Sequence, residues 1–283
     1  MRKKWWITGG AFGVGAVMLL VSGFSAMAST SGYDAYKSAL KHTKEVTNLT
    51  ADMKLAVTDN GTELLAGNAD IKWDRKLNSG SVAASFDNHT QMHALNLFRQ
   101  DGKVIVKSAD DEIYRVKELD AYKWQEEGST PNPPKVVEQI FDALMGNIRE
   151  LATVESASDG GKQAELHLSG SQIPAIANVL GTLAVSKLAE NDQQHLSFPK
   201  LTDNIKVEEI NLDAKINASN VLEKQAAEIN IAGTDDSGVQ HDLVIELQVD
   251  FRDLNQTVPE RVDLTGKQIV EIKDEETKRG WHH

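Results

Sequence analysis

From Leu49 onward, apolar residues recur at every second position, which is the period of a strand with one buried face. The first two runs, residues 49–57 and 65–73, are separated by Asn60-Gly61, a pair typical of hairpin turns. Four more runs follow at short intervals, at residues 82–86, 92–98, 104–106 and 113–116. Parallel strands need long crossover connections, so six runs joined by short turns predict an antiparallel meander.

Apolar spacing near 3.6 residues predicts helices before and after this meander. The first covers residues 32–48, with Ser31 or Asp34 as its N-cap. Two more are expected at residues 136–151, directly after a pair of prolines, and at residues 172–189. The last of these is apolar around most of its circumference, so it needs contacts on two sides.

The last third of the chain returns to the two-residue period. A short strand is predicted at 163–168, and longer ones at 205–216, 226–231, 243–251 and 262–272. Residues 243–251 alternate without a break, which indicates one buried and one wet face. The proline-rich segment 118–134 and the charged tail 273–283 are expected to be irregular.

The N-terminus has the pattern of an export signal. A basic stretch at residues 2–4 precedes an apolar run at residues 5–24, and Ala26-Met27-Ala28 matches a signal peptidase site with cleavage before Ser29. Twenty such residues are also long enough to span a bilayer. Residues 1–28 are therefore interpreted as a signal peptide or, if uncleaved, as an N-terminal membrane anchor.

Composition narrows the classes of protein. The 283 residues are 40% hydrophobic, which is enough to bury a core without disulfides or metals. The net charge of -12 argues against nucleic-acid binding, which needs clustered Lys and Arg. With no cysteine, the chain has no thiol nucleophile, thiolate zinc site, disulfide or lipid-modified cysteine.

Histidines and carboxylates form no pattern that indicates catalysis. His89 and His93 are four residues apart in or beside a strand, where about 13 Å would separate them, so they cannot share one metal ion. Acidic pairs such as Asp235-Asp236 fall at turns, where Asp bonds to the backbone. Common hydrolase and phosphate-binding motifs are absent. We therefore expect no enzymatic activity, no metal and no cofactor.

The order of the predicted elements resembles that of LolA-like envelope proteins, a superfamily that includes LppX- and LprG-type lipoproteins. A helix, a long meander, two apolar helices and more strands follow the export signal, over residues 33–272. The resemblance implies an incomplete antiparallel barrel around helices, with acyl chains in the apolar space between them. No cysteine follows the signal, so this chain departs from the lipoprotein branch. Residues 32–41 (GYDAYKSALK) also resemble the start of other signal-bearing Gram-positive proteins, a group that implies no function.

Apolar side chains on the two later helices are more numerous than one face of a sheet requires. The ordinary interpretation is that they pack in a core. The alternative is that sheet and helices enclose an apolar cavity, with aromatic residues of the meander on the opposite wall. The candidate ligand-binding residues are Trp73, Phe86, Phe98 and Tyr114 on the meander, and Ile140, Phe141, Leu144, Ile148, Ile176, Leu180 and Leu183 on the helices.

We therefore expect an α+β protein, in which a long antiparallel sheet curls into a half-open barrel with two or three helices packed on its concave face. Residues 29–272 would form a single LolA-like domain outside the cytoplasm, secreted or associated with the cell envelope. The expected function is non-enzymatic binding of a lipid or other hydrophobic ligand, as a carrier or sensor. The alternative is an envelope module that contacts another protein and has no small-molecule ligand. Residues 5–24 would contact the membrane if uncleaved.

Overall fold

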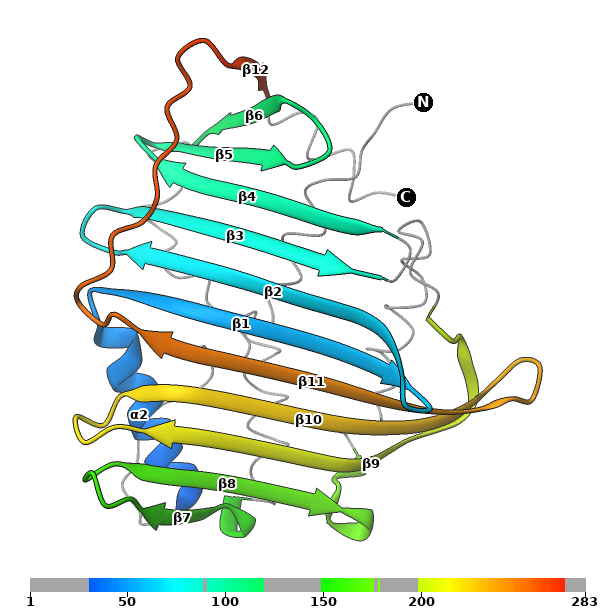
Figure 1. Ribbon diagram of the computed structural model, residues 1–283. Coiled ribbons are helices and arrows are strands. Elements are labelled where there is room, and N and C mark those ends of the chain that lie inside the picture. The colour runs from blue at the N-terminus through cyan, green and yellow to red at the C-terminus, as the bar shows by residue number, and fades with distance from the viewer. Residues whose placement is uncertain (1–30, 89–90, 120–148, 176–177, 179–197, 273–283) are drawn as a thin grey trace.

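One unclosed, curled β-sheet dominates the computed structural model, which describes residues 31–88, 91–119, 149–175, 178 and 198–272. Its twelve strands lie in the order β12-β6-β5-β4-β3-β2-β1-β11-β10-β9-β8-β7 (Figure 1). The protein is thus rich in β-structure, as its alternating pattern predicts.

The first six strands form the predicted meander, in which each strand pairs antiparallel with the next. They are β1 (Asn48–Asp59), β2 (Thr62–Asp74), β3 (Ser79–Asp87), β4 (Met92–Gln100), β5 (Lys103–Ser108) and β6 (Ile113–Glu118). Asn60 and Gly61 form the β1–β2 turn with φ angles of 49° and 78°, the left-handed conformation for which this pair is favoured. The hairpin prediction is confirmed.

The second block of strands begins with β7 (Thr153–Ser156) and β8 (Lys162–Ser169), which are flanked by the short 3-10 helices η1 (Arg149–Leu151) and η2 (Gly170–Gln172). It continues with β9 (Leu201–Ile216), β10 (Leu222–Asp235) and β11 (Gln240–Arg252). All five strands pair antiparallel with their neighbours. Strand β1 pairs with β2 on one side and with β11 on the other, so both blocks join in a single sheet.

The helix α2 (Gly32–Glu45) begins where predicted, because the Ser31 hydroxyl caps it by accepting a hydrogen bond from the backbone N–H of Asp34. Its residues Ala39 and Leu40 are buried against the sheet, mainly over strands β7–β10. Glycine is required at position 32, since a Cβ there would lie 1.9 Å from the carbonyl oxygen of Thr153.

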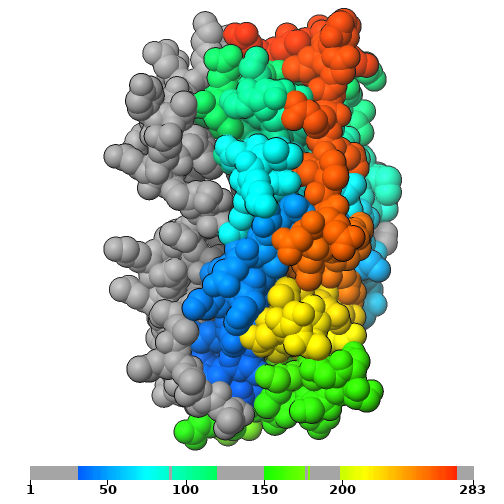
Figure 2. All heavy atoms as spheres, turned by 90° about the vertical axis from the view of Figure 1, so that its left-hand side faces the viewer, coloured from blue at the N-terminus to red at the C-terminus, as the bar shows by residue number. Residues whose placement is uncertain are grey.

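Residues 253–267, here called the strap, cross the sheet on the side opposite α2 (Figure 2). The N–H of Glu260 donates to the Ser81 hydroxyl at 3.0 Å, and the Gln100 side chain bonds both the N–H and the carbonyl of Val262 at 2.9 Å. The strap then leads to β12 (Gln268–Glu271), which pairs parallel with β6.

Two sequence predictions need correction here. The last segment is not a strand over residues 262–272, because a turn with Gly266 at φ 71° interrupts it and only Gln268–Glu271 is extended and paired. The sheet is therefore mixed and not wholly antiparallel, since β12 runs parallel to β6. Of the two or three expected helices, α2 alone lies wholly within the described residues; most of 136–151 and 172–189 lies outside them.

Candidate functional site

The two faces of the sheet differ sharply in character, because neighbouring residues of a strand point to opposite sides. Side chains on the face that carries α2, here called the apolar face, are almost all hydrophobic. On the central strands they are Leu49, Ala51, Met53, Leu55 and Val57 of β1, Leu65, Ala69, Ile71 and Trp73 of β2, and Leu243, Ile245, Leu247, Val249 and Phe251 of β11. On these central strands the opposite face, here called the polar face, carries mostly charged, amide and small side chains.

Burial of the apolar face is uneven. Two clusters of buried residues lie beneath α2 and along the second strand block, and one of them extends onto β1 and β2. Within them Leu40, Leu168 and Val249 are at 1% exposure or less. On β3, β4 and β5, in contrast, every apolar residue of this face is only half-buried; these residues are Val82, Ala84, Phe86, Leu95, Leu97, Val104 and Val106. Because α2 lies mainly over β7–β10, no described helix covers this half of the face.

The register separates the four aromatic candidates of the meander. Trp73 pairs with Gly80 and Phe86 with Gly67, which places both aromatic side chains on the apolar face. Phe98 pairs with Ser81 and Ile105 instead, on the polar face. Tyr114 pairs with Lys107 and shares the polar face with Phe98. The four residues therefore do not line one wall.

Trp73 and Phe86 each have a basic side chain beside them. The Arg99 guanidinium lies 5.2 Å from the centre of the Trp73 ring, and burial lowers the pKa of Arg99. The His93 ring stacks on Phe86 at 4.8 Å between centroids and lies 3.7 Å from the Asp110 carboxylate. The meander half of the apolar face thus includes cationic or titratable groups among its hydrophobic side chains.

The remaining candidates lie outside the described residues, and their contacts stay predictions. These are the helical residues Ile140, Phe141, Leu144, Ile148, Ile176, Leu180 and Leu183, and the cleavage-site residues Ala26, Ala28 and Ser29.

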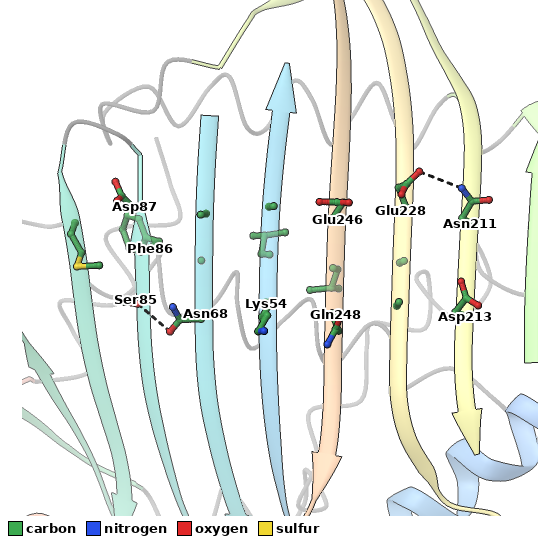
Figure 3. Close-up of a pocket in the computed structure, with 18 residues that line it drawn as sticks. Lys54, Asn68, Ser85, Phe86, Asp87, Asn211, Asp213, Glu228, Glu246 and Gln248 are labelled. Carbon is green, nitrogen blue, oxygen red and sulfur yellow. Dashed lines mark hydrogen bonds between the residues drawn. The ribbon is translucent and has the colours of Figure 1, made fainter. Parts of the chain in front are cut away.

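A trough of about 690 Å³ lies across the middle of the polar face (Figure 3). It spans strands β9, β10, β11, β1, β2, β3 and β4. One cross-strand row places Glu228, Glu246, Ala56, Ala66 and Asp87 side by side. The two alanines leave room between the carboxylates at either end, so the row forms a low floor with polar ends.

A second row runs beside the first, through Asp213, Ala226, Gln248, Lys54 and Asn68 to Ser85. The trough therefore combines four carboxylates with one lysine and several amides. In Figure 3 an amide N–H of Asn211 donates to Glu228 at 3.3 Å, and the Ser85 hydroxyl donates to Asn68 at 3.1 Å.

Charges beside the trough are compensated. Asp52 and Asp70 lie directly opposite each other on β1 and β2, and Arg252 binds both carboxylates. Its hydrogen bond lowers the pKa of Asp52, and in turn the Asp52 carboxylate raises the pKa of Arg252. Lys72 lies 2.7 Å from Glu260 of the strap, and that hydrogen bond raises the pKa of Lys72.

Within the trough the arrangement is different. Glu228 and Glu246 face each other directly across β10 and β11, and like charges in such positions repel. Among the described residues no ion pair involves either of them, and Lys54 forms none. Glu228 and Glu246 therefore bring two negative charges to the trough that no described basic side chain pairs with.

Within the described ranges, no three His, Asp or Glu side chains are placed to hold a metal ion. The helices of that same part of the chain are too short or too polar to cross a membrane.

Comparisons with known proteins give structural likeness only. No protein-family model matches the chain, and no curated protein matches it. Among solved structures, an uncharacterised conserved protein from Thermus thermophilus is 8% identical with a TM-score of 0.31, over 83% of this chain and 97% of that one.

Two further solved structures have similar coverage. A LolA superfamily protein from Nitrosomonas europaea is 9% identical, with a TM-score of 0.24 over 84% of this chain and 97% of that one. A β-barrel-like protein with a domain of unknown function from Brucella abortus is 10% identical, with a TM-score of 0.20 over 74% and 99%. At these scores the function must be inferred from the chain's own side chains.

Sequence reasoning missed the trough. The residues that could have indicated it are the polar ones that alternate with the apolar residues of β1, β2 and β11, at even-numbered positions. They include Lys54, Asn68 and Glu246. Lys54 and Asn68 meet in the β1–β2 hairpin, but Glu246 joins them only through the pairing of β1 with β11, nearly 200 positions later in the chain.

Proposed function

We propose that this protein binds a lipid or another hydrophobic ligand in the cell envelope and catalyses no reaction. The observation that supports the proposal is the meander half of the apolar face, where hydrophobic side chains of β3, β4 and β5 stay half-buried beneath no described helix. Exposed apolar area is costly in water, at about 25 cal/mol per Å². A continuous face of this kind is typical of a binding surface.

In this proposal the two predicted apolar helices, 136–151 and 172–189, lie on the same side of the sheet as α2 and complete a half-open barrel. The ligand occupies the space between them and the strands. Trp73 and Phe86 line the sheet wall, together with Leu97 and Val106. The wall consists mainly of aliphatic and aromatic carbon, so shape would select the ligand more than polar contacts would.

The proposal includes a location outside the cytoplasm, with residues 29–272 as one domain. N-terminal sequencing of the protein from its host tests this part. A first residue of Ser29 means cleavage, whereas an intact Met1 together with recovery in the membrane fraction means an anchor.

Organic extraction of the purified full-length protein, followed by mass spectrometry, tests the binding function. We expect a stoichiometric lipid or similar hydrophobic molecule to be released. A protein that carries no such molecule, and takes up none from mixed lipid vesicles, would contradict the proposal.

Two neighbouring residues supply a matched pair of variants. Leu97 points to the apolar face and Phe98 to the polar face, and both are half-buried on β4. Leu97→Gln should lower the amount of bound ligand severalfold, and Phe98→Gln should leave it near the wild-type level. Circular dichroism of both variants checks that the sheet is intact.

Contact with another envelope protein is the second candidate. It is supported by the edge strand β12, where Ile269 and Val270 are 44% and 47% exposed. An exposed edge strand with apolar side chains can pair with a strand of a partner. Photo-crosslinking from position 269 in the host would capture such a partner. If no partner is captured, this second candidate is rejected and ligand binding remains the one proposed function.

A further inference from the structure

The strand β12 forms one edge of the sheet, since within the described residues it pairs with β6 alone (Figure 1). Every residue of β12 is exposed. We infer that this edge pairs antiparallel with β12 of a second copy of the chain, so that two sheets join across a two-fold axis. The inference does not depend on ligand binding, because none of the residues placed in the ligand wall lies on β12.

The outer edge of β12 offers backbone groups for this pairing. The N–H of Ile272 donates to the Val116 carbonyl on β6 at 2.8 Å. Backbone groups of successive strand residues point to alternate sides, so those of Val270 also face β6, whereas those of Ile269 and Glu271 face outward. In an antiparallel pair, two outward-facing residues that lie opposite each other exchange both of their N–H···O bonds. Only registers that pair odd-numbered residues with odd-numbered residues allow these bonds to form.

Charge selects one of these registers. If Ile269 lies opposite the partner's Ile269, then Lys267 lies opposite the partner's Glu271, and the two-fold axis repeats that contact on the other side. A shift by two residues removes both contacts, because it places Ile269 opposite the partner's Glu271 or, in the other direction, opposite the partner's Lys267. Opposite charges directly across two antiparallel strands attract each other. The register centred on Ile269 is therefore favoured.

The three side chains that would make this contact lie on one face of the edge. Ile269 is the register partner of Tyr114, and the Lys267 ammonium lies 6.0 Å from the centre of the Tyr114 ring. Glu271 pairs with Val116, two residues further along the same face of β6. Within the described part of the chain neither Lys267 nor Glu271 forms an ion pair, so both charges can pair with a second copy.

The opposite edge of the sheet lacks this self-complementary pattern. Its strand β7 contains Glu155 but no basic residue. Two copies that paired through β7 would therefore gain no ion pair between the two strands. The charge pattern thus favours β12 over β7 as the edge that pairs with itself.

So short a strand buries little surface, and the dimer should be weak. Since the chain has no cysteine, single introduced cysteines can trap it. Ile269→Cys would place the two sulfurs on residues about 5.5 Å apart at Cα, within the range of a disulfide. Val270→Cys is the matched control, because Val270 is 47% exposed and Ile269 44%. Its two copies would be diagonal neighbours about 7–8 Å apart, too far for a disulfide.

Oxidation of the purified full-length variants in mild detergent, followed by non-reducing gel electrophoresis, tests the inference. Ile269→Cys should form severalfold more covalent dimer than Val270→Cys. In the Ile269→Cys background, Lys267→Glu or Glu271→Lys alone places like charges opposite each other at both contacts and should lower the dimer yield severalfold. The two charge changes together restore opposite charges and should restore the yield.

Equal yields from the two cysteine positions, or no dimer from either, would overturn the inference. A double charge variant whose yield stays as low as that of the single variants would do so as well. So would photo-crosslinking from position 269 that captures a different envelope protein and no second copy. None of these results affects the lipid extraction experiment, so the two proposals fail separately.

Discussion

The imidazole of His241 lies 2.7 Å from the carboxylate of Asp59, and this contact joins the ends of two hairpins. Asp59 ends β1, and His241 lies at the start of β11. The second ring nitrogen of His241 lies 3.5 Å from the Asp235 carboxylate at the end of β10. Three neighbouring strands are thus held together at one end, here called the corner, by one largely buried histidine.

This corner should make stability depend on pH. Burial lowers the pKa of His241, but the hydrogen bond to Asp59 and the negative charges of Asp59 and Asp235 outweigh that effect and the net pKa is raised. The ion pairs therefore stabilise the fold fully below the unfolded-state pKa of about 6.5, and this contribution is lost as pH rises through the folded-state pKa. His241→Gln should be less stable than the wild type at about pH 5.5, with a smaller difference at about pH 8.5.

Urea unfolding of both proteins at the two pH values measures the effect. His167→Gln is the control, because His167 also lies near a carboxylate, Glu209 at 3.5 Å, but its side chain is 60% exposed. The free energy of unfolding of the control should change between the two pH values as much as that of the wild type does. If the same is true of His241→Gln, the contact between His241 and the two carboxylates does not make stability depend on pH.

Gly80 is expected to be intolerant of a side chain. A Cβ at this position would lie 2.5 Å from Cε3 of Trp73 on the neighbouring strand. Gly80→Ala should lower the free energy of unfolding by about 1–3 kcal/mol, because the indole must move within a packed layer. At Gly67, on the same face, the nearest atom would be 3.5 Å away, so Gly67→Ala should be neutral or stabilising by up to about 1 kcal/mol. Denaturant unfolding compares the two, and equal costs would contradict the tight packing of Trp73.

Attachment of α2 to the sheet depends on Leu40. This side chain is 1% exposed and belongs to the buried cluster with Val249 and Phe251. Leu40→Ala should cost about 2–5 kcal/mol by leaving a cavity, whereas its exposed neighbour Lys41→Ala should change stability by about 0.5 kcal/mol or less. Thermal unfolding followed by circular dichroism gives both values; a tolerated Leu40→Ala would mean that the helix is not anchored there.

Attachment of the strap to the sheet should depend on Gln100, whose side-chain amide forms hydrogen bonds with both the N–H and the carbonyl of Val262. Gln100 is buried, so Gln100→Ala removes two hydrogen bonds that water cannot readily replace, at an expected cost of about 1–3 kcal/mol. Limited proteolysis should then cleave faster within residues 253–267. Gln256→Ala, an exposed strap residue, is the control and should leave the cleavage rate unchanged. Equal rates for all three proteins would show that the strap is held by other contacts.

The alternating pattern was sufficient for most strands and their local pairing. Asn60-Gly61 and Asp101-Gly102 mark hairpin turns through their own backbone preferences, and both pairs adopt left-handed φ angles. The prediction of one strand over residues 262–272 was wrong, because apolar residues alternate there as in a strand although the chain turns at Gly266. Local preferences cannot reveal that β12 runs parallel to β6, since that pairing joins residues about 150 positions apart.

By itself, the sequence determined which segments form most of the strands and which residues of a strand share its apolar face, because period and turn chemistry act between near neighbours. Tertiary structure alone decided which side chains share a face. It placed Trp73 and Phe98 on opposite sides of the sheet, and it brought Glu246 beside Ala56 and Glu228. Register is set by packing across the whole sheet, and a shift of one residue reverses every side chain, so a pattern within one strand cannot specify the site.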